Sequence, residues 1–315
     1  MARKKIALIG AGNIGGSMAH LCLLKGLGDV ILFDVVEGLP QGKALDLSHA
    51  GPVEGFDGNV IGTNNYEDIA GADVCIVTAG IARKPGMSRD DLLGTNAKIL
   101  SSVAEGIKKH APNSFVIVIT NPLDAMVTLM KRATGFPKNR VVGQSGILDS
   151  SRYRSFIARE LSVSVNSVAA MVLGGHGDDM VPVRTSCIVG GVPVEKLISS
   201  KRLDEIEARV RNAGGEVVAL LKTGSAYFSP ASAAVRMTEA YLFDKKEILP
   251  CAALLEGEYG VNGYYFCVPV MIGGGGVEKI IDIDLNSADR KAFDESFNHV
   301  KDIVQAMDRL LGRQG

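Results

Sequence analysis

The stretch Gly10-Ala-Gly-Asn-Ile-Gly15 decides the fold of the N-terminal half, because it follows a short apolar run and opens an apolar helical pattern. Ile6 to Ile9 predict a buried strand, and apolar spacing from Ile14 to Leu24 predicts a helix directly after the glycines. In such a turn Gly10 makes the tight bend, Gly12 lets the backbone approach a phosphate, and Gly15 lets helix and strand pack closely. The helix N-terminus, from Asn13 and Ile14, offers unpaired N–H groups to an anion. The stretch therefore predicts a pyrophosphate site.

Asp34 supplies the context for this motif, because the spacing G-x-G-x-x-G alone also occurs by chance. Val30 to Phe33 predict a second buried strand that ends on Asp34, nineteen residues after Gly15. A carboxylate there can accept hydrogen bonds from the ribose hydroxyls of NAD. We predict NAD rather than NADP, since Asp34 would repel a 2′-phosphate and no cation follows in Val35-Val-Glu37. The alternative is that Asp34 is a surface turn residue.

The composition is that of a globular chain with two domains. Of its 315 residues 46% are hydrophobic, enough for a sizeable core. The 34 basic and 35 acidic residues are scattered and nearly cancel, so we predict no nucleic-acid partner and no membrane surface as partner. Five cysteines without a C-x-x-C pair indicate reduced thiols, a cytoplasmic location and no zinc site. No apolar run approaches the ~20 residues of a membrane-spanning helix.

Strands and helices alternate through the first half. Four more strands are expected at 60–61, 74–77, 115–119 and 140–142. Helices are expected between them at 39–50, 90–109 and 123–133. Six strands separated by helices predict an α/β fold with an open, doubly wound parallel sheet of the Rossmann type. The small residues Thr78-Ala-Gly80 at the end of the fourth strand would let a cofactor pass close to the backbone, where ligands of such sheets bind.

The second half has a different pattern. Helices are expected at 150–162, 202–222, 231–243 and 287–311. Segments 263–272 and 276–283 alternate or run apolar like antiparallel strands. We therefore predict a dinucleotide-binding domain over residues 1–145 and an α+β catalytic domain over residues 146–315.

Charged residues mark a candidate substrate site. Arg83 and Arg89 flank a Pro-Gly break in the loop after the fourth strand, and the guanidinium fork matches carboxylates. The loop is a candidate lid over a carboxylate substrate, with a solvated basic loop as the alternative. Asp149 and Arg152 are three residues apart and share one helix face, although a salt bridge at a helix start would give the same spacing.

His176 is the candidate proton-transfer group. It stands in Gly174-Gly-His-Gly-Asp178 after an apolar run, so it projects from a strand end on a flexible backbone rather than filling a core. The other histidines are expected to be structural: His20, His49, His110 and His299. No pair of histidines or cysteines has the spacing of a metal site, so no metal is predicted.

Five motifs together resemble the lactate/malate dehydrogenase family and occur in the family's order. They are Gly10 to Gly15, Ala79 to Arg89, Thr120-Asn-Pro-Leu-Asp124, Gly146 to Arg152 and Gly174 to Asp178. The branch that the chain most resembles is the lactate-dehydrogenase-like malate dehydrogenases of bacteria. The resemblance implies NAD as cofactor, and we assign Asn96 to the cofactor site together with the residues named above.

The resemblance also implies roles for the site residues. By it His176 donates and accepts the proton and Asp149 orients it. Arg152 would bind the C1 carboxylate of the substrate, and Arg89 would polarise the reacting carbonyl. Asn121 would contact both substrate and cofactor.

Arg83 matches the position that selects the substrate in this family. Arginine there goes with the second carboxylate of malate or oxaloacetate. Lactate-using members usually carry an uncharged residue, or a lysine in a lengthened loop in one parasite lineage, and no lengthening is visible here. Ser225 falls near the substrate wall. Gln144-Ser145 stands where many relatives have Met-Ala, a departure that could alter packing at the subunit or active-site wall.

The motifs and the family resemblance together imply an NAD-dependent malate dehydrogenase that acts on a small dicarboxylate, malate or oxaloacetate. An L-lactate or broader 2-hydroxy-acid dehydrogenase is the first alternative, and Arg83 is the residue that separates the two. A noncatalytic nicotinamide-binding protein is the second alternative, and it would keep the glycine turn without the pair His176 and Asp149. The family leads us to expect a homo-oligomer, a tetramer rather than a dimer.

Overall fold

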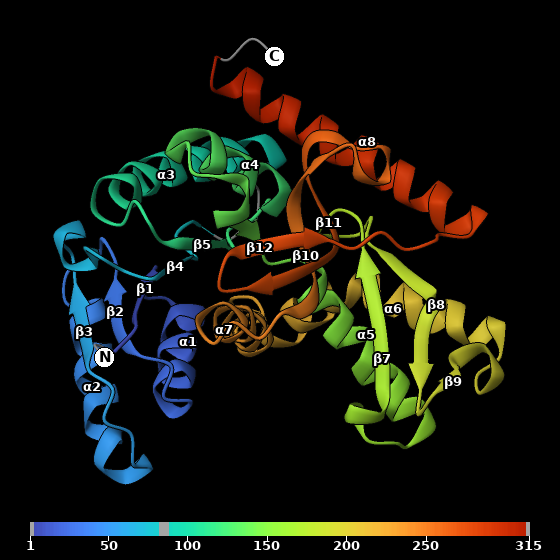
Figure 1. Cartoon of the computed structure of the whole chain (residues 1–315), viewed down its shortest axis with the longest axis horizontal. Helices are drawn as coiled ribbons and strands as arrows, with labels where there is room; N and C mark the ends of the chain where they lie inside the picture. The colour runs from blue at the N-terminus through green and yellow to red at the C-terminus, as the bar shows by residue number, and fades with distance from the viewer. Residues whose placement is uncertain (1–2, 82–87, 313–315) are drawn as a thin grey trace.

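The structure, a computed structural model, describes residues 3–81 and 88–312, and of Arg89 it describes the backbone alone. One large sheet and one small sheet organise these residues (Figure 1). The large sheet has the strand order β12-β11-β10-β6-β5-β4-β1-β2-β3, and the small sheet has the order β7-β8-β9.

The six strands of the large sheet that come first in the sequence run parallel to one another. They are β1 (Lys5–Ile9), β2 (Asp29–Phe33), β3 (Val60–Thr63), β4 (Val74–Val77), β5 (Phe115–Val118) and β6 (Val141–Gly143). β4 and β5 are apolar and buried throughout, as expected for strands covered on both faces. All six predicted strands and the doubly wound Rossmann arrangement are confirmed.

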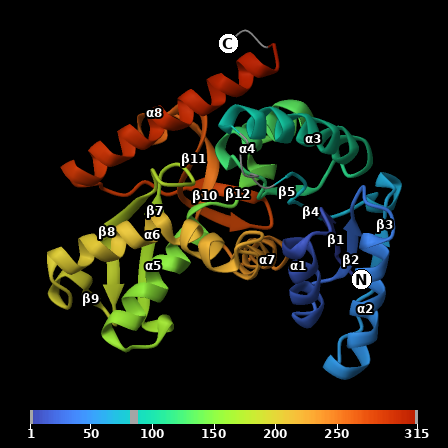
Figure 2. The same cartoon turned by 180° about the vertical axis from the view of Figure 1, so that it is seen from behind.

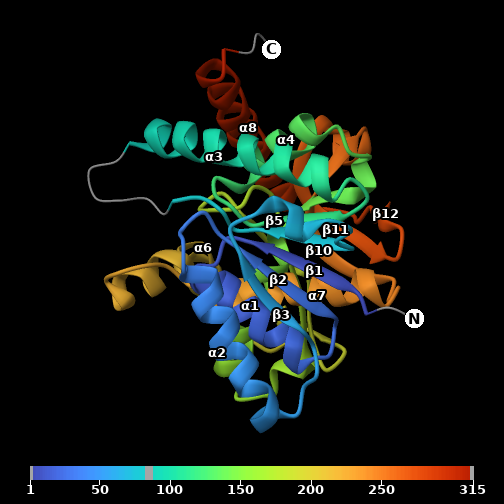
Figure 3. The ribbon, with the colours of Figure 1, turned by 90° about the vertical axis from the view of Figure 1, so that its left-hand side faces the viewer.

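Helices cover both faces of this parallel sheet. They are α1 (Asn13–Leu24), α2 (Leu39–Glu54), α3 (Arg89–His110) and α4 (Leu123–Thr134). Figure 3 shows α1 and α2 on one side of the strands and α3 and α4 on the other. α3 begins with a capping box, in which Ser88 Oγ accepts a bond from the Asp91 N–H and the Asp91 carboxylate accepts one from the Ser88 N–H. The predicted helices 90–109 and 123–133 agree with α3 and α4.

Three antiparallel strands from the second half extend the same sheet. They are β10 (Glu247–Glu256), β11 (Asn262–Gly273) and β12 (Gly276–Ile280), and β10 joins β6 where Ala252 lies opposite Gly143. The strands expected at 263–272 and 276–283 are confirmed. β10 was not expected, because Pro250 weakens a strand pattern, and no pattern indicated that these strands would pair with the first half.

The remaining elements build a second, smaller core and cover the first. The small sheet contains β7 (Val168–Leu173), β8 (Val181–Val189) and β9 (Val192–Pro193), and it packs with α5 (Gly146–Leu161) and α6 (Ser200–Leu221). α7 (Phe228–Leu242) packs beside α1, and α8 (Ser287–Leu310) runs from the side of β8 toward α4 and α3 (Figure 2). Short 3₁₀ turns lie at Tyr66–Ile69, Lys138–Arg140, Val165–Ser167, Val194–Lys196 and Glu258–Gly260.

The buried core does not divide at residue 145. One hydrophobic cluster includes residues of β1, β2, β4, β5 and β6 together with residues of α7, β10, β11 and α8, whereas the second cluster lies within residues 153–210. The domain boundary at 145 and 146 stays a prediction. None of the described helices has the length and apolar character needed to cross a membrane.

Candidate active site

The glycine turn between β1 and α1 has the shape of an anion cradle. Gly10 has φ +115°, and a Cβ there would lie 2.4 Å from Thr78 Oγ1; a Cβ on Gly15 would lie 1.9 Å from the Gly10 carbonyl oxygen. A Cβ on Gly12 would meet nothing within 4 Å, so the face of the turn is open there. α1 has no side-chain cap and no acidic residue in its first turn, which leaves its first N–H groups for an anion. These features fit a dinucleotide pyrophosphate.

Asp34 closes the turn from the neighbouring strand. Its Oδ2 accepts a bond of 2.7 Å from the Ala11 N–H, and its Oδ1 accepts one of 3.0 Å from the Val36 N–H. A carboxylate has about four acceptor positions, so it can still accept from a ribose hydroxyl. Asp34 is thus a structural part of the turn as well as a candidate cofactor ligand.

Lys43 of α2 is a residue that the sequence reasoning missed at this turn. Its Nζ donates a bond of 2.9 Å to the Gly12 carbonyl. Burial lowers the pKa of Lys43, while the nearby charge of Asp34 acts to raise it. Lys43 lies well beyond the three residues that follow Asp34 in the sequence, and α2 brings it back to the turn.

The carboxyl ends of β4 and β5 continue this edge of the sheet. The Thr78 and Ala79 N–H groups both donate to the Ile9 carbonyl, at 2.8 and 2.9 Å. Asn96 is buried, and its side-chain amide accepts from the Ile81 N–H at 2.8 Å and donates to the Asn121 carbonyl at 2.8 Å. Asn96 therefore ties together the two segments that were expected to meet the cofactor. Because strands β1 and β4 are where the strand order reverses, this edge is the usual ligand position of a doubly wound sheet.

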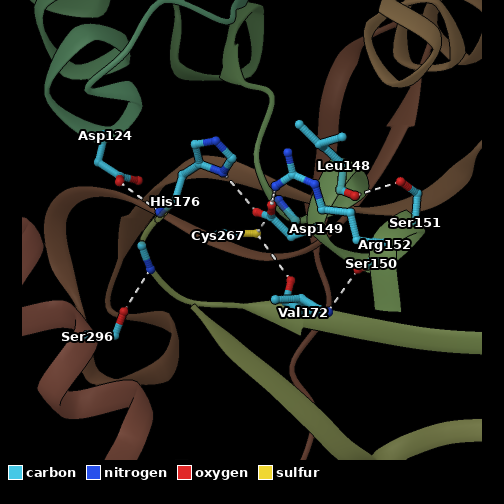
Figure 4. Close-up of polar contacts among 12 residues, drawn as sticks. Asp124, Leu148, Asp149, Ser150, Ser151, Arg152, Val172, His176, Cys267 and Ser296 are labelled. Atoms are coloured by element: carbon cyan, nitrogen blue, oxygen red, sulfur yellow. Dashed lines mark hydrogen bonds and ion pairs between the residues drawn. The ribbon is translucent and has the colours of Figure 1, made fainter. Parts of the chain in front are cut away.

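His176, Asp149 and Arg152 come together although 27 residues separate the first two. His176 Nδ1 lies 2.8 Å from Asp149 Oδ2, and Arg152 Nη1 lies 3.0 Å from Asp149 Oδ1 (Figure 4). The Asp149 side chain is 1% exposed, while those of His176 and Arg152 are each 16% exposed. A carboxylate only accepts, so Nδ1 carries the proton and Nε2 is the atom that can exchange one with a substrate.

The pKa of His176 is raised above its ordinary value. Burial is the largest single influence and lowers it, but the charge and the hydrogen bond of Asp149 raise it, and the net shift is upward. Asp124 adds in the same direction and Arg152 opposes. A raised pKa favours the protonated ring, which can give its proton to a substrate oxygen and take it back.

The backbone before His176 is hydrogen-bonded to other segments, which the expectation of a flexible backbone did not include. The Gly174 N–H donates to the Cys267 carbonyl at 3.1 Å, and the Gly175 N–H donates to Ser296 Oγ at 2.8 Å. The His176 N–H donates to Asp124 Oδ2 at 3.0 Å (Figure 4). A Cβ on Gly175 would lie 2.8 Å from Val300, so the glycine serves close packing against α8.

The other predicted substrate residues are less completely described. Arg83 lies outside the described residues, and Arg89 is the first residue of α3. Asn121 is exposed three residues beyond the end of β5, and Ser225 is exposed in the segment between α6 and α7. The Arg152 guanidinium faces α6, where a Cβ on Gly214 would lie 3.7 Å from Nη2.

Gln144 and Ser145, the departure noted in the sequence, are both buried. The Gln144 N–H donates to the Val118 carbonyl, and its side-chain amide donates to the Pro230 carbonyl of α7. Ser145 shares a hydrogen bond with the thiol of Cys267. The departure therefore joins the end of the parallel sheet to α7.

Other nucleophiles and ligands do not form a second centre in the described residues. All five cysteines are free and buried, and burial raises the pKa of each thiol, for example that of Cys22 to about 12. No group of three His, Cys, Asp or Glu side chains in the described part could hold a metal ion. His299, expected to be structural, lies 2.5 Å from Asp179 in the segment after His176.

Known proteins are similar to this chain in sequence and in fold over nearly its whole length. The sequence pattern of the lactate/malate dehydrogenase NAD binding domain matches residues 4–143, and that of the family's alpha/beta C-terminal domain matches residues 147–310. The malate dehydrogenase of Geobacter sulfurreducens is 60% identical over 316 residues, which cover 98% of this chain and 100% of that protein.

Solved structures agree with these matches. The malate dehydrogenase of Cryptosporidium parvum has a TM-score of 0.95 at 46% identity and covers 98% of this chain and 99% of its own. The lactate dehydrogenase of the same organism, solved with lactic acid and nicotinamide adenine dinucleotide, has a TM-score of 0.95 at 50% identity, with the same shares covered. The chain therefore belongs to the lactate/malate dehydrogenase family.

Proposed function

We propose that this chain is an NAD-dependent malate dehydrogenase. It would oxidise (S)-malate to oxaloacetate while NAD is reduced to NADH, and it would also catalyse the reverse reaction. The observation that carries the proposal is the group His176, Asp149 and Arg152, with ring and carboxylate 2.8 Å apart. A proton-transfer ring beside an arginine suits a substrate that is both a hydroxy acid and a carboxylate. The malate dehydrogenases among the relatives, 57–60% identical, support the same activity.

The chain's own residues would divide the chemistry as follows. The turn Gly10 to Gly15 and Asp34 hold the dinucleotide, whose nicotinamide supplies or accepts the hydride when it is bound. His176 Nε2 takes the hydroxyl proton in malate oxidation and returns it in oxaloacetate reduction. Asp149 keeps the ring oriented and stabilises its charged form.

Three arginines would hold the dianionic substrate. Arg152 would bind the C1 carboxylate, and Arg89 would polarise the reacting carbonyl. Arg83 would bind the distal carboxylate and so select malate over lactate. Three cations exceed the charge of oxaloacetate, and the surplus charge can stabilise the oxygen that becomes negative as hydride arrives. Asn121 and Ser225 would complete the wall of the site.

Lactate dehydrogenase is the second candidate, because the Cryptosporidium parvum lactate dehydrogenase is 50% identical to this chain. NADH consumption with oxaloacetate and pyruvate, measured side by side, tests the choice. We expect oxaloacetate to be strongly preferred. A preference for pyruvate would replace malate by lactate as the substrate.

Arg83→Gln sharpens this test. A distal carboxylate bound without its cation should cost about 2–5 kcal/mol, so kcat/KM for oxaloacetate should fall roughly thirty-fold or more. Pyruvate, which lacks that carboxylate, should lose less or gain. Lys84→Gln, which removes the neighbouring cation, is the matched control and should change kcat/KM little for either oxaloacetate or pyruvate. A parallel fall for both substrates in Arg83→Gln would make Arg83 a general loop residue.

We further propose that the protein is cytoplasmic, that it forms a homotetramer and that its domain boundary lies between residues 145 and 146. Five free cysteines support a reducing compartment such as the cytoplasm. The two family matches, which end at residue 143 and begin at residue 147, support the boundary. Sedimentation equilibrium would separate tetramer, dimer and monomer.

A further inference from the structure

Asp124 is a buried carboxyl group that no role assigned so far uses. It is the second residue of α4, and the residue is only 2% exposed. Oδ2 accepts the hydrogen bond of 3.0 Å from the backbone N–H of His176. Oδ1 is buried and has no hydrogen-bond partner, the only buried side-chain oxygen or nitrogen of which this holds in the described part of the chain. A buried carboxylate with an unused acceptor is costly to keep ionised, so its position calls for a reason.

The surroundings of Asp124 make its charge felt at the imidazole. Burial raises its pKa to about 6, while the hydrogen bond and the charge of His176 act to lower it. The other charged groups that face the imidazole are Asp149 and Arg152 from α5. The charges of Asp124 and Asp149 also raise the pKa of the Cys267 thiol in β11. Two carboxylates thus act on one ring, one through Nδ1 and one from the backbone side.

We propose that Asp124 is a positioning residue for proton transfer, which fixes the His176 backbone and, when ionised, stabilises the imidazolium form. This inference rests on the proposed dehydrogenase activity. Asp124 also lies three residues after Asn121. One short segment therefore carries both the residue expected to contact substrate and cofactor and the carboxylate that binds the His176 backbone.

The sign of the effect follows from the two ionisations. Above about pH 6 Asp124 is charged and helps His176 keep its proton. As pH falls through about 6, Asp124 takes up a proton and withdraws this support, so the two groups titrate as a coupled pair. Oδ1, which has no partner in the described residues, offers the position for that proton.

Asp124→Asn tests the charge separately from the anchor, since the amide oxygen can still accept from the His176 N–H. In a plot of kcat/KM for malate oxidation against pH, we expect the rising limb to shift to lower pH by about one pH unit. NADH affinity, followed by fluorescence, should change little. Ser296→Ala removes a different anchor of the same loop without changing charge, so it should lower kcat and leave the limb in place. A limb that stays in place in Asp124→Asn would overturn the proposal and leave Asp124 a structural residue.

A second measurement needs no Asp124 variant, in case that variant does not fold. The ring signals of histidine-labelled wild-type protein are titrated by NMR, with the His176 signal assigned by its loss in His176→Asn. We expect the His176 curve to show an added step near pH 6 from Asp124. A single-step curve would overturn the coupling. Because this titration uses no substrate, it stays informative even if oxaloacetate proves not to be the substrate.

Discussion

Two glycine-rich segments follow strands in this molecule, and they are built in opposite ways. The turn at Gly10 to Gly15 leaves an open face at Gly12 and uncapped N–H groups at the start of α1. In the loop at Gly174 to His176 three successive N–H groups are bonded, to β11, α8 and α4. Open donors can bind an anion, whereas bonded donors hold a side chain in place. Glycine thus serves binding in the first segment and rigidity in the second.

This contrast predicts that changes near the first segment alter cofactor binding and changes near the second alter the proton transfer. His176→Asn gives the largest expected effect. General acid–base catalysis contributes about 10²–10⁴-fold, so hydride transfer in a single turnover should fall by that factor. NADH affinity, followed separately by fluorescence, should stay close to the wild-type value. Near-normal hydride transfer would move the proton donor to water or to another side chain and would break the comparison.

Asp149→Asn should have an intermediate effect, roughly 10–10³-fold on hydride transfer, since the ring remains but loses its orienting charge. In the wild type the raised pKa of His176 means that the ring loses its proton only at higher pH than a free imidazole does. Malate oxidation should therefore rise with pH through that pKa, and oxaloacetate reduction should fall. In the variant both limbs should move to lower pH. Limbs that stay in place would show that Asp149 acts on geometry alone.

Asp34→Asn should have the smallest of these effects, on cofactor choice. Loss of the like charge facing a 2′-phosphate should raise kcat/KM with NADP relative to NAD by roughly tenfold, with Lys43 left as the nearby cation. Glu37→Gln removes an exposed acid from the same segment and serves as the control, with a smaller expected change. A wild type with comparable kcat/KM for the two cofactors would reject the role of Asp34 from the start.

Short-range patterns predicted most of the fold. The strands of the parallel sheet and the helices between them follow from runs of local apolar residues, and α8 follows from its amphipathic spacing at Ser287–Leu310. The pairing of Ala252 with Gly143 was not predicted, because register between distant strands leaves no local signal. Of the small sheet only the strand end before His176 was expected, since β9 has only two residues and Ala169 to Met171 in β7 are exposed or only partly buried.

The candidate site divides in the same way. His176 and Asp149 were predicted from flanking glycines and helix spacing and from the family resemblance, and the structure brings them within 2.8 Å. Asp124, Ser296 and Lys43 were missed because each bonds to backbone atoms of a distant segment, which residue type alone does not reveal. The role of Arg83 stays a prediction, because this residue lies outside the described part.

The completion of the sheet by β10, β11 and β12 has a consequence for the order in which the chain is synthesised. Until β10 leaves the ribosome, β6 is an edge strand with unpaired backbone groups, and its partner Ala252 comes about a hundred residues after Gly143. During synthesis the N-terminal half therefore has an exposed sheet edge at β6 until β10 has been made. A fragment that ends near residue 145 should keep that exposed edge permanently and be prone to aggregation.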